Sequence, residues 1–308
     1  MYHAPVLCEE AVAFLNVSGS RTYVDGTVGG GGHAEKICER LAGDGRLICV
    51  DRDVEAIAAA RKRLAAFSAR LTFVHAPFAT LAAELAALNI GKVAGVLLDL
   101  GVSSRQLDEG SRGFTFRADA PLDMRMDGRQ ALSAMEVVNT YEHARLADVL
   151  WRFGEERHSR RVAREICRRR PVRTTGALRE AVAAAVGGAF AVKSLARVFQ
   201  AIRIEVNGEL DQLESLLSAT PFLLAEGGRL VVISYHSLED RIVKDFMRRE
   251  STPAPGRALL PATPGPVRFR LVTRKAVVPG PGEVEQNPRA RSAKMRVAER
   301  TDHEQPRG

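Results

Sequence analysis

Between residues 21 and 100, short apolar runs typical of buried strands alternate with longer runs whose apolar residues recur at helical spacing. The apolar runs predict strands at 21–27, 46–51, 71–76 and 93–100. The intervening patterns predict helices at 32–41, 53–67, which Asp53 is placed to cap, and 78–88. Continuous apolar strands separated by helices indicate a parallel sheet that is covered on both faces, so we predict an α/β fold.

The alternation stops after residue 103, and the pattern becomes mainly helical. Helices are predicted at 131–141, 142–153, 159–169, 175–186 and 193–206. Alternation then resumes with a helix at 209–224, a buried strand at 228–234, a helix at 237–249, a proline-rich loop at 251–266 and strands at 267–278 and 293–299. We therefore predict an all-helical module, 104–206, inserted into one α/β domain formed by 1–103 and 207–300, with a disordered tail at 301–308.

Composition narrows the class of protein. The chain has 308 residues, of which 45% are hydrophobic and 27% charged, as is ordinary for a globular protein. No apolar run approaches the roughly 18 residues of a membrane span, and the N-terminus does not resemble a signal peptide. We therefore expect a cytoplasmic protein with no membrane partner. The cysteines at 8, 38, 49 and 167 lack metal-ligand spacing, so we expect reduced, mostly buried thiols and no metal site.

The formal net charge of +8 is unevenly distributed. Segment 151–173 carries nine arginines and three glutamates, segment 241–308 has a net charge of +8, and the rest of the chain is slightly acidic. Two basic segments favour a polyanionic partner, with nucleic acid ahead of a membrane surface. The alternative is that these arginines are simply solvated.

A glycine-rich turn follows the first predicted strand. Its sequence, DGTVGGGGH, spans 25–33, and Asp51 ends the next predicted strand. Glycines at a strand-to-helix turn let the backbone approach a ligand closely, and an acid one strand later can accept hydrogen bonds from ribose hydroxyls. Together they indicate an adenosine-containing cofactor, although a plain loop remains the alternative.

The identity of the cofactor depends on the first residue of this turn. No GxxxxGK[ST] motif occurs, which excludes a P-loop. A dinucleotide site directs its helix dipole at a pyrophosphate, and the carboxylate of Asp25 would repel that group. An ammonium-bearing ligand such as S-adenosylmethionine suits the carboxylate, which favours a methyl donor over NAD.

Two more strand ends carry polar side chains. Asp99 ends the fourth predicted strand, and Ser103, Ser104 and Gln106 follow it closely. Tyr235 and His236 follow the fifth predicted strand. Ligands of open α/β sheets bind at this edge, so we expect these side chains near the cofactor. The alternatives are an ordinary turn after Asp99 and a structural histidine ahead of a helix capped by Ser237, with Asp240 at its third position.

Seven blocks of the sequence resemble the signature blocks of the bacterial ribosomal RNA small subunit methyltransferase H family. In chain order they are DGTVGGGGHA, LLDLGVSSRQLD, RGFTF, PLDMRM, ARVFQAIRIEVNGEL, SYHSLEDRIVK and NPRARSAKMRVAER. The resemblance implies a Rossmann-like class I S-adenosylmethionine-dependent methyltransferase with an inserted substrate-recognition domain. It also implies methylation of the N4 amine of one cytidine in the decoding centre of 16S rRNA, within the small ribosomal subunit, and it leaves the oligomeric state open.

The resemblance also carries site residues to this chain. The cofactor contacts that it implies are Gly31, Gly32, His33, Asp51, Phe78, Asp99 and Gln106. The chain lacks the proline-rigidified block that many amino-methyltransferases have after the fourth strand. Our hypothesis is that Asp99 positions the cofactor, while other polar side chains at these strand ends orient a base that is flipped out of the RNA. The candidates for that role are Ser103, Ser104, Tyr235 and His236.

Five arginines of the predicted helical module recur at helical spacing, which predicts phosphate contacts: Arg157, Arg160, Arg161, Arg164 and Arg168. Phe114, Phe116 and Trp151 could stack on bases, but we expect them in the core. Three other functions stay open at this point. They are a methyltransferase of DNA or a small molecule, an NAD-dependent oxidoreductase, and a non-catalytic RNA-binding protein.

Overall fold

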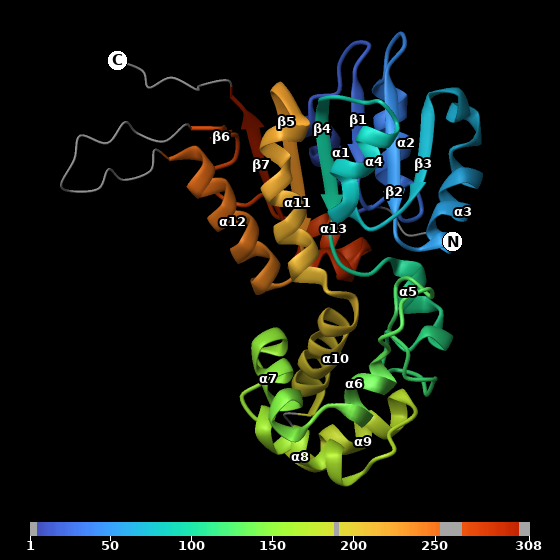
Figure 1. Ribbon diagram of the computed structural model, residues 1–308, viewed down its shortest axis with the longest axis vertical. Helices are drawn as coiled ribbons and strands as arrows, with labels where there is room; N and C mark the ends of the chain where they lie inside the picture. Colours follow the sequence, from blue (N-terminus) through green and yellow to red (C-terminus); the bar gives the residue numbers. More distant parts are fainter. Residues whose placement is uncertain (1–4, 188–190, 253–266, 302–308) are drawn as a thin grey trace, which may run out of the picture. The chain divides into compact units, whose positions relative to one another are not determined.

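The computed structural model describes residues 5–187, 191–252 and 267–301. The chain divides into two compact units (Figure 1). The α/β unit consists of Met1–Gly101 and Asp211–Gly308, and the helical unit of Val102–Leu210. Within the described residues, no helix is long and apolar enough to cross a membrane.

The α/β unit is built on a seven-stranded sheet with the order β3-β2-β1-β4-β5-β7-β6. The strands are β1 Thr22–Asp25, β2 Arg46–Asp51, β3 Leu71–His75, β4 Val93–Asp99, β5 Leu224–Ser234, β6 Phe269–Leu271 and β7 Lys294–Arg300. Strands β1 to β5 are parallel, while β7 runs antiparallel to both β5 and β6. The carboxyl ends of the five parallel strands therefore share one edge of the sheet.

Helices cover both faces of this sheet. One apolar cluster holds side chains of α1 (Cys8–Leu15), α2 (Gly32–Arg40) and α3 (Val54–Arg63) against the sheet. A second cluster holds side chains of α4 (Leu81–Ala87), α11 (Glu209–Leu223) and α12 (Ser237–Ser251). The remaining elements are α13 (Pro281–Gln286) and the 3₁₀ helices η1 (Ala65–Arg70), η2 (Phe78–Thr80) and η5 (Pro288–Ser292). Helices on both faces of a mainly parallel sheet confirm the predicted α/β fold class.

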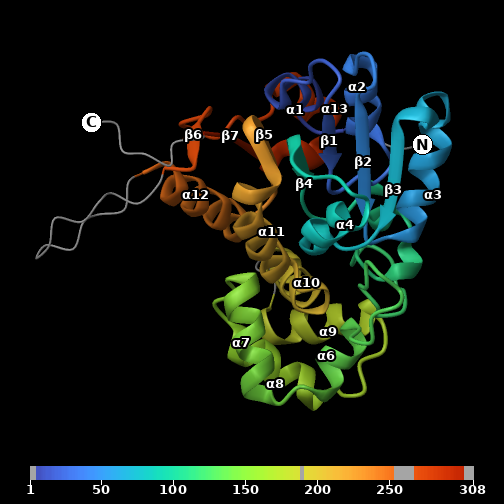
Figure 2. The same ribbon diagram turned by 45° about the horizontal axis from the view of Figure 1, so that its top comes forward.

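The helical unit has an apolar core of its own, to which Leu146, Val162, Leu178 and Val198 contribute. Its elements are α5 Ser104–Asp108, η3 Gly110–Arg112, α6 Ala134–Thr140, α7 His143–Gly154, α8 Ser159–Arg168, α9 Thr175–Val186 and α10 Ala191–Asn207. Helix α7 packs on both α8 and α10 (Figure 2). Helix α8 buries Val162 and Ile166 and turns its arginines to solvent, so the arginine spacing follows from its amphipathic pattern.

The structure differs from the predicted elements in a few places. The predicted strand 267–278 shortens to β6, because the N–H groups of Val272 and Thr273 both donate to the carbonyl of Val297 and end the ladder. The helix expected at 53–67 ends at Arg63 and continues as η1, and Asp53 caps its start as predicted. Helices α1 and α13 were not predicted. Most of the predicted loop at 251–266 and the tail from 302 lie outside the described residues.

Candidate active site

Three carboxylates stand at the carboxyl ends of neighbouring strands. Asp25 ends β1, Asp51 ends β2 and Asp99 ends β4, and β1 lies between the other two strands. The glycine-rich turn leaves β1 at this edge and is hydrogen bonded to both neighbours. Gly26 N–H donates to the Leu97 carbonyl and Val28 N–H donates to the Val50 carbonyl, each at 2.9 Å.

Glycine is required in this turn for two physical reasons. Gly29 and Gly31 have φ angles of +50° and +81°, which side chains other than glycine rarely adopt. A Cβ atom at Gly26 would lie 2.6 Å from Leu98 Cδ2 and 3.7 Å from Phe78 Cβ. The turn is therefore pressed against the sheet edge with Phe78 beside it, and Gly31 is the N-cap of α2.

The carboxyl group of Asp25 is buried, and only one of its oxygen atoms has a hydrogen-bond partner in the described part of the chain. The side chain is only 1% exposed. Its Oδ1 accepts a hydrogen bond from Thr27 N–H at 3.2 Å, whereas Oδ2 is buried without a hydrogen-bond partner among the described residues. Burial raises the pKa of Asp25 from 3.8 to about 7, although nearby His33 acts in the opposite direction. A cationic group of a ligand would be a suitable partner for a buried carboxylate oxygen of this kind.

Asp51 is held by the glycine turn. Its Oδ2 accepts from Gly29 N–H and its Oδ1 accepts from Asp53 N–H, each at 2.9 Å. Burial of the carboxyl group raises its pKa to about 6, and the two backbone hydrogen bonds act against this shift. The side chain remains partly accessible, so each oxygen has a lone pair left for a hydroxyl donor.

Asp99 is anchored from three directions. Its N–H donates to Thr27 Oγ1 at 2.7 Å, and the Tyr235 hydroxyl donates to Asp99 Oδ1 at 2.8 Å. Asp99 Oδ2 lies 3.8 Å from Nδ1 of His33, whose Nε2 lies 3.0 Å from the Val6 carbonyl. The carbonyl can only accept, so Nε2 carries a proton and Nδ1 faces the carboxylate. Burial raises the pKa of Asp99, while His33 and the Tyr235 hydroxyl lower it.

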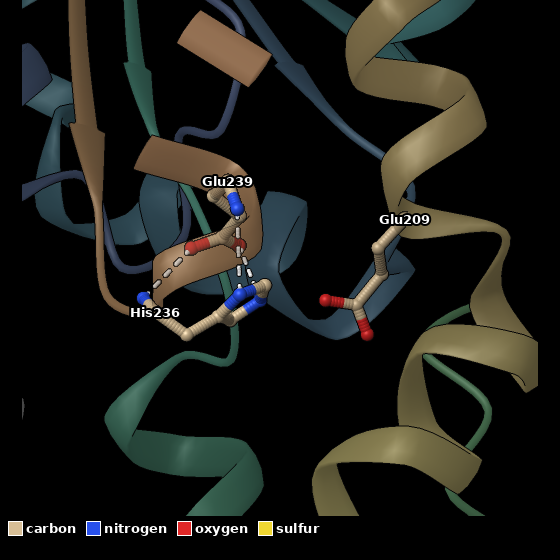
Figure 3. Close-up of side chains that lie close together, drawn as sticks. All are labelled: Glu209, His236 and Glu239. Carbon is tan, nitrogen blue, oxygen red and sulfur yellow. Dashed lines mark hydrogen bonds and ion pairs between the residues drawn. The ribbon is translucent and has the colours of Figure 1, made fainter. Parts of the chain in front are cut away.

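The segment after β5 is fixed by Glu239. The N–H groups of Tyr235 and His236 donate to Glu239 Oε2 at 2.8 and 3.3 Å. The ring of His236 accepts from Glu239 N–H through Nδ1 at 3.4 Å, and its Nε2 lies 3.2 Å from Glu239 Oε1 (Figure 3). His236 is therefore the N-cap of α12, in a capping box with Glu239. The interpretation of Ser237 as the cap was wrong, because the carboxylate that closes the box is three residues after His236.

The other predicted side chains of the Asp99 block belong to the helical unit. Ser103 is the N-cap of α5 and accepts a hydrogen bond from Gln106 N–H at 3.2 Å. Gln106 is buried, and its Oε1 accepts from Ser103 N–H at 2.9 Å. Both side chains thus have a structural function at the start of a short helix. The structure places Ser104 as the first residue of α5 but does not describe its side chain.

The predicted arginines lie on or next to α8. Four of them are exposed and have no ion pair within the described part of the chain; we call this set, Arg157, Arg160, Arg161 and Arg164, the arginine row. Arg168 is also exposed but pairs with Glu165 at 2.7 Å. Four unpaired guanidinium groups suit an anionic partner.

The three aromatic side chains differ in their exposure. Phe114 is buried in the helical core, and Phe116 packs edge-on against Phe199 with ring centroids 5.3 Å apart. Trp151 is exposed, so our prediction that it lies in the core was wrong. Sequence reasoning also missed Thr27 and Glu239 as supports of the site. The His236-to-Glu239 spacing of a capping box was the one signal that could have revealed Glu239.

Comparisons with known proteins match nearly the whole chain. The family model described as "MraW methylase family" matches residues 1–301. A relative from Syntrophus aciditrophicus is 47% identical over 97% of this chain and 98% of its own, and one from Dehalococcoides mccartyi is 46% identical over 97% and 86%. Both are named "Ribosomal RNA small subunit methyltransferase H". A solved rRNA methylase from Streptococcus thermophilus is 8% identical over 98% of this chain and all of its own, with a TM-score of 0.44, too low to support a conclusion.

Proposed function

Because the chain belongs to the MraW methylase family, we propose that it uses S-adenosylmethionine to methylate the N4 amine of a cytidine in the decoding centre of 16S rRNA. The observation that carries the proposal is its identity of 46–47%, across 97% of the chain, to relatives named for small-subunit rRNA methylation. The choice of a cytidine N4 amine rests on the seven sequence blocks. Such an enzyme would work in the cytoplasm, where ribosomal subunits are assembled.

The residues at the sheet edge fit S-adenosylmethionine. The cofactor supplies an electrophilic methyl group on a positively charged sulfur, and its amino acid part carries an ammonium group. The unpaired Oδ2 of Asp25 is a suitable partner for such a cation. The residues that the resemblance assigns to the cofactor are Gly31, Gly32, His33, Asp51, Phe78, Asp99 and Gln106, and the sequence already pointed to Asp25 as the partner of the ammonium group.

The carboxylate of Asp51 suits the ribose part of the cofactor. Its two oxygens are fixed by backbone N–H groups of the glycine turn and of α3's N-cap, so the carboxylate is oriented before a ligand arrives. Two vicinal hydroxyls can donate to the remaining lone pairs. NAD also carries such hydroxyls, so Asp51 does not discriminate between the two cofactors, whereas Asp25 does.

The chemical task is to hold a weak nucleophile in line with the methyl group. The lone pair of the cytosine amine is delocalised into the ring, and positioning can supply about 7–11 kcal/mol in well-oriented cases. We propose that Asp99 positions the cofactor, and the candidates for orienting the flipped base are Ser103, Ser104, Tyr235 and His236. The Tyr235 hydroxyl donates a hydrogen bond to Asp99, so Tyr235 would fix the carboxylate rather than act as a base.

The helical unit supplies cationic groups for the RNA backbone. We assign phosphate contacts to the arginine row and a weaker one to Arg168, because Glu165 already neutralises that guanidinium. A structured RNA also has to present its cytidine outside the base stack, which requires a firm hold on the backbone on both sides.

The decisive experiment is mass spectrometry of 16S rRNA from cells that lack the protein. Loss of one N4-methylcytidine, restored by the wild-type gene but not by Asp99→Ala, is expected. Retention of every N4-methylcytidine would contradict the proposal. Methyl transfer to free 16S rRNA, assembled small subunits and DNA would then identify the substrate. Isothermal titration with S-adenosylmethionine and with NADH tests the oxidoreductase alternative. An oxidoreductase would bind NADH and not S-adenosylmethionine.

A further inference from the structure

The chain has a single tryptophan, and that residue is exposed. Trp151 lies on α7 with 57% of its surface accessible, although tryptophan is usually among the well-buried residue types. The core positions of the same helix, such as Leu146 and Leu150, are fully buried. The indole ring therefore contributes little to the core of the helical unit. Within the described residues it has no ring–ring or cation–π contact, whereas the nearby Arg152 lies over Phe153.

The backbone after α7 leads directly from the helix turn that carries this ring into the arginine row. Glu155 N–H donates to the carbonyl of Trp151 at 3.0 Å, and Glu156 N–H donates to that of Leu150 at 3.2 Å. The chain then runs back along α7, because a ring nitrogen of His143 lies 3.1 Å from the carbonyl of Arg160. Arg157 is next to the turn of helix that carries Trp151, and the rest of the row continues toward the start of α7.

From this arrangement we propose that Trp151 stacks on an unpaired base of the RNA substrate while the arginine row binds the neighbouring phosphates. The inference rests on the proposed function and names how the helical unit recognises its RNA. Proteins that bind single-stranded nucleic acid combine these two features, an aromatic platform for bases and cationic groups along the backbone. Every base offers a flat face, so the contact holds the strand without reading its sequence.

Charge favours RNA over a second copy of this chain as the occupant of the ring. Segment 143–170 contains nine arginines and four acidic residues, a formal net charge of +5. A symmetric dimer through Trp151 would bring two such surfaces together, because both copies would use the same patch. Their mutual repulsion opposes that contact, whereas a polyanion is attracted to the surface.

The single tryptophan allows a direct test in the full-length protein. Intrinsic fluorescence is measured while a single-stranded RNA oligonucleotide is added, and again with an abasic oligonucleotide of the same length. We expect saturable quenching with the first and none with the second. Trp151→Leu should weaken binding of the base-containing strand about 5- to 150-fold, the range given by stacking of one base, and leave the abasic strand unaffected.

The matched control is Val192→Ala, which removes another exposed apolar side chain of the same unit and should leave RNA binding unchanged. Substitution of the arginine row should weaken binding of both oligonucleotides. Unchanged fluorescence during RNA binding would overturn the proposal. A spectrum that instead changes with protein concentration, without RNA, would assign Trp151 to contact between copies and would also overturn it.

Methyl transfer to small subunits separates this inference from the proposed function. If the wild-type protein methylates rRNA but Trp151→Leu has an unchanged KM for the subunit, the stacking contact is absent and the function stands. If the wild-type protein methylates no rRNA, the proposed function fails whatever the fluorescence shows. The expected result is wild-type activity together with a KM that rises in Trp151→Leu.

Discussion

Replacing Asp25 by asparagine should make the unliganded protein more stable and its cofactor binding weaker. The substitution keeps the size of the side chain and the Oδ1 acceptor for Thr27 N–H. It removes a buried negative charge whose Oδ2 has no hydrogen-bond partner among the residues that the structure describes. A buried, unpaired carboxylate lowers the stability of the unliganded protein. Such a destabilising group is expected at a functional site, here one that binds a cationic ligand.

The magnitude follows from the raised pKa of Asp25. A pKa of about 7 in place of the ordinary 3.8 corresponds to about 4 kcal/mol that disfavours the ionised form in the folded protein. The amide NH₂ of asparagine would take the place of the unpaired oxygen, and an unpaired buried donor costs about 1–3 kcal/mol. We therefore expect Asp25→Asn to raise the free energy of unfolding by about 1–3 kcal/mol above pH 7.

The sign of the pH dependence is fixed by the same shift. A carboxyl group whose pKa is raised on folding favours the folded state most below the unfolded pKa, near 4. That contribution is lost as the pH rises through about 7, the folded pKa. Between pH 5 and pH 8, wild-type stability should fall relative to that of Asp25→Asn by about 2–3 kcal/mol.

The assay is urea denaturation of both proteins at pH 5, 6, 7 and 8, together with isothermal titration of S-adenosylmethionine at each pH. Wild-type affinity should increase with pH from 5 to 8, because the cationic ligand binds the ionised carboxylate. Asp25→Asn should bind about 10- to 100-fold more weakly at pH 8, as expected for one charge-assisted hydrogen bond. A stability difference that does not change with pH, or equal affinities at pH 8, would refute this reasoning.

Three further outcomes are expected. Tyr235→Phe should lower kcat for methyl transfer at least several-fold and leave the KM for RNA unchanged. The hydrogen bond from Tyr235 lowers the pKa of Asp99, so its loss should raise that pKa and move the acidic limb of the pH–rate profile to higher pH. Glutamine at three positions of the arginine row should make the slope of log K for RNA binding against log salt concentration shallower by about 2. The control is Arg129→Gln, which removes an arginine that is 60% exposed but already paired with Asp127, and it should leave this slope unchanged. Gly32→Ala should destabilise the protein by about 1–3 kcal/mol in thermal unfolding, because its Cβ would lie 2.9 Å from Pro5 Cγ; an unchanged Tm would contradict this.

The position of the site could be predicted from sequence because each acidic residue ends an apolar run. Parallel strands have to end at a common edge, so Asp25, Asp51 and Asp99 were expected together before any contact was known. What these groups contact could not be predicted in the same way. The hydrogen bond from Tyr235 to Asp99 joins residues 136 positions apart, and no local pattern encodes such a pair.

The exposure of Trp151 was also beyond prediction. A tryptophan in an amphipathic helix is ordinarily assigned to the core, and a step of one residue places Trp151 only 100° around the helix axis from buried Leu150. A difference of 100° around the helix axis separates a buried position from an exposed one, and the spacing of apolar residues does not define the buried face that closely. The capping residue of α12 was missed for a related reason, since a histidine is a less usual N-cap than a serine.

The hydrogen bond from Leu7 N–H to Glu283 Oε1, at 2.7 Å, joins residues 276 positions apart. Leu7 follows Val6, whose carbonyl holds His33. During synthesis the chain emerges from its N-terminus, so this hydrogen bond cannot form until α13 has been made. Strand β4 likewise waits for β5, because more than a hundred residues separate them. Contacts of such long sequence separation form slowly, so the cofactor-binding site that we propose is completed only when nearly the whole polypeptide has been translated.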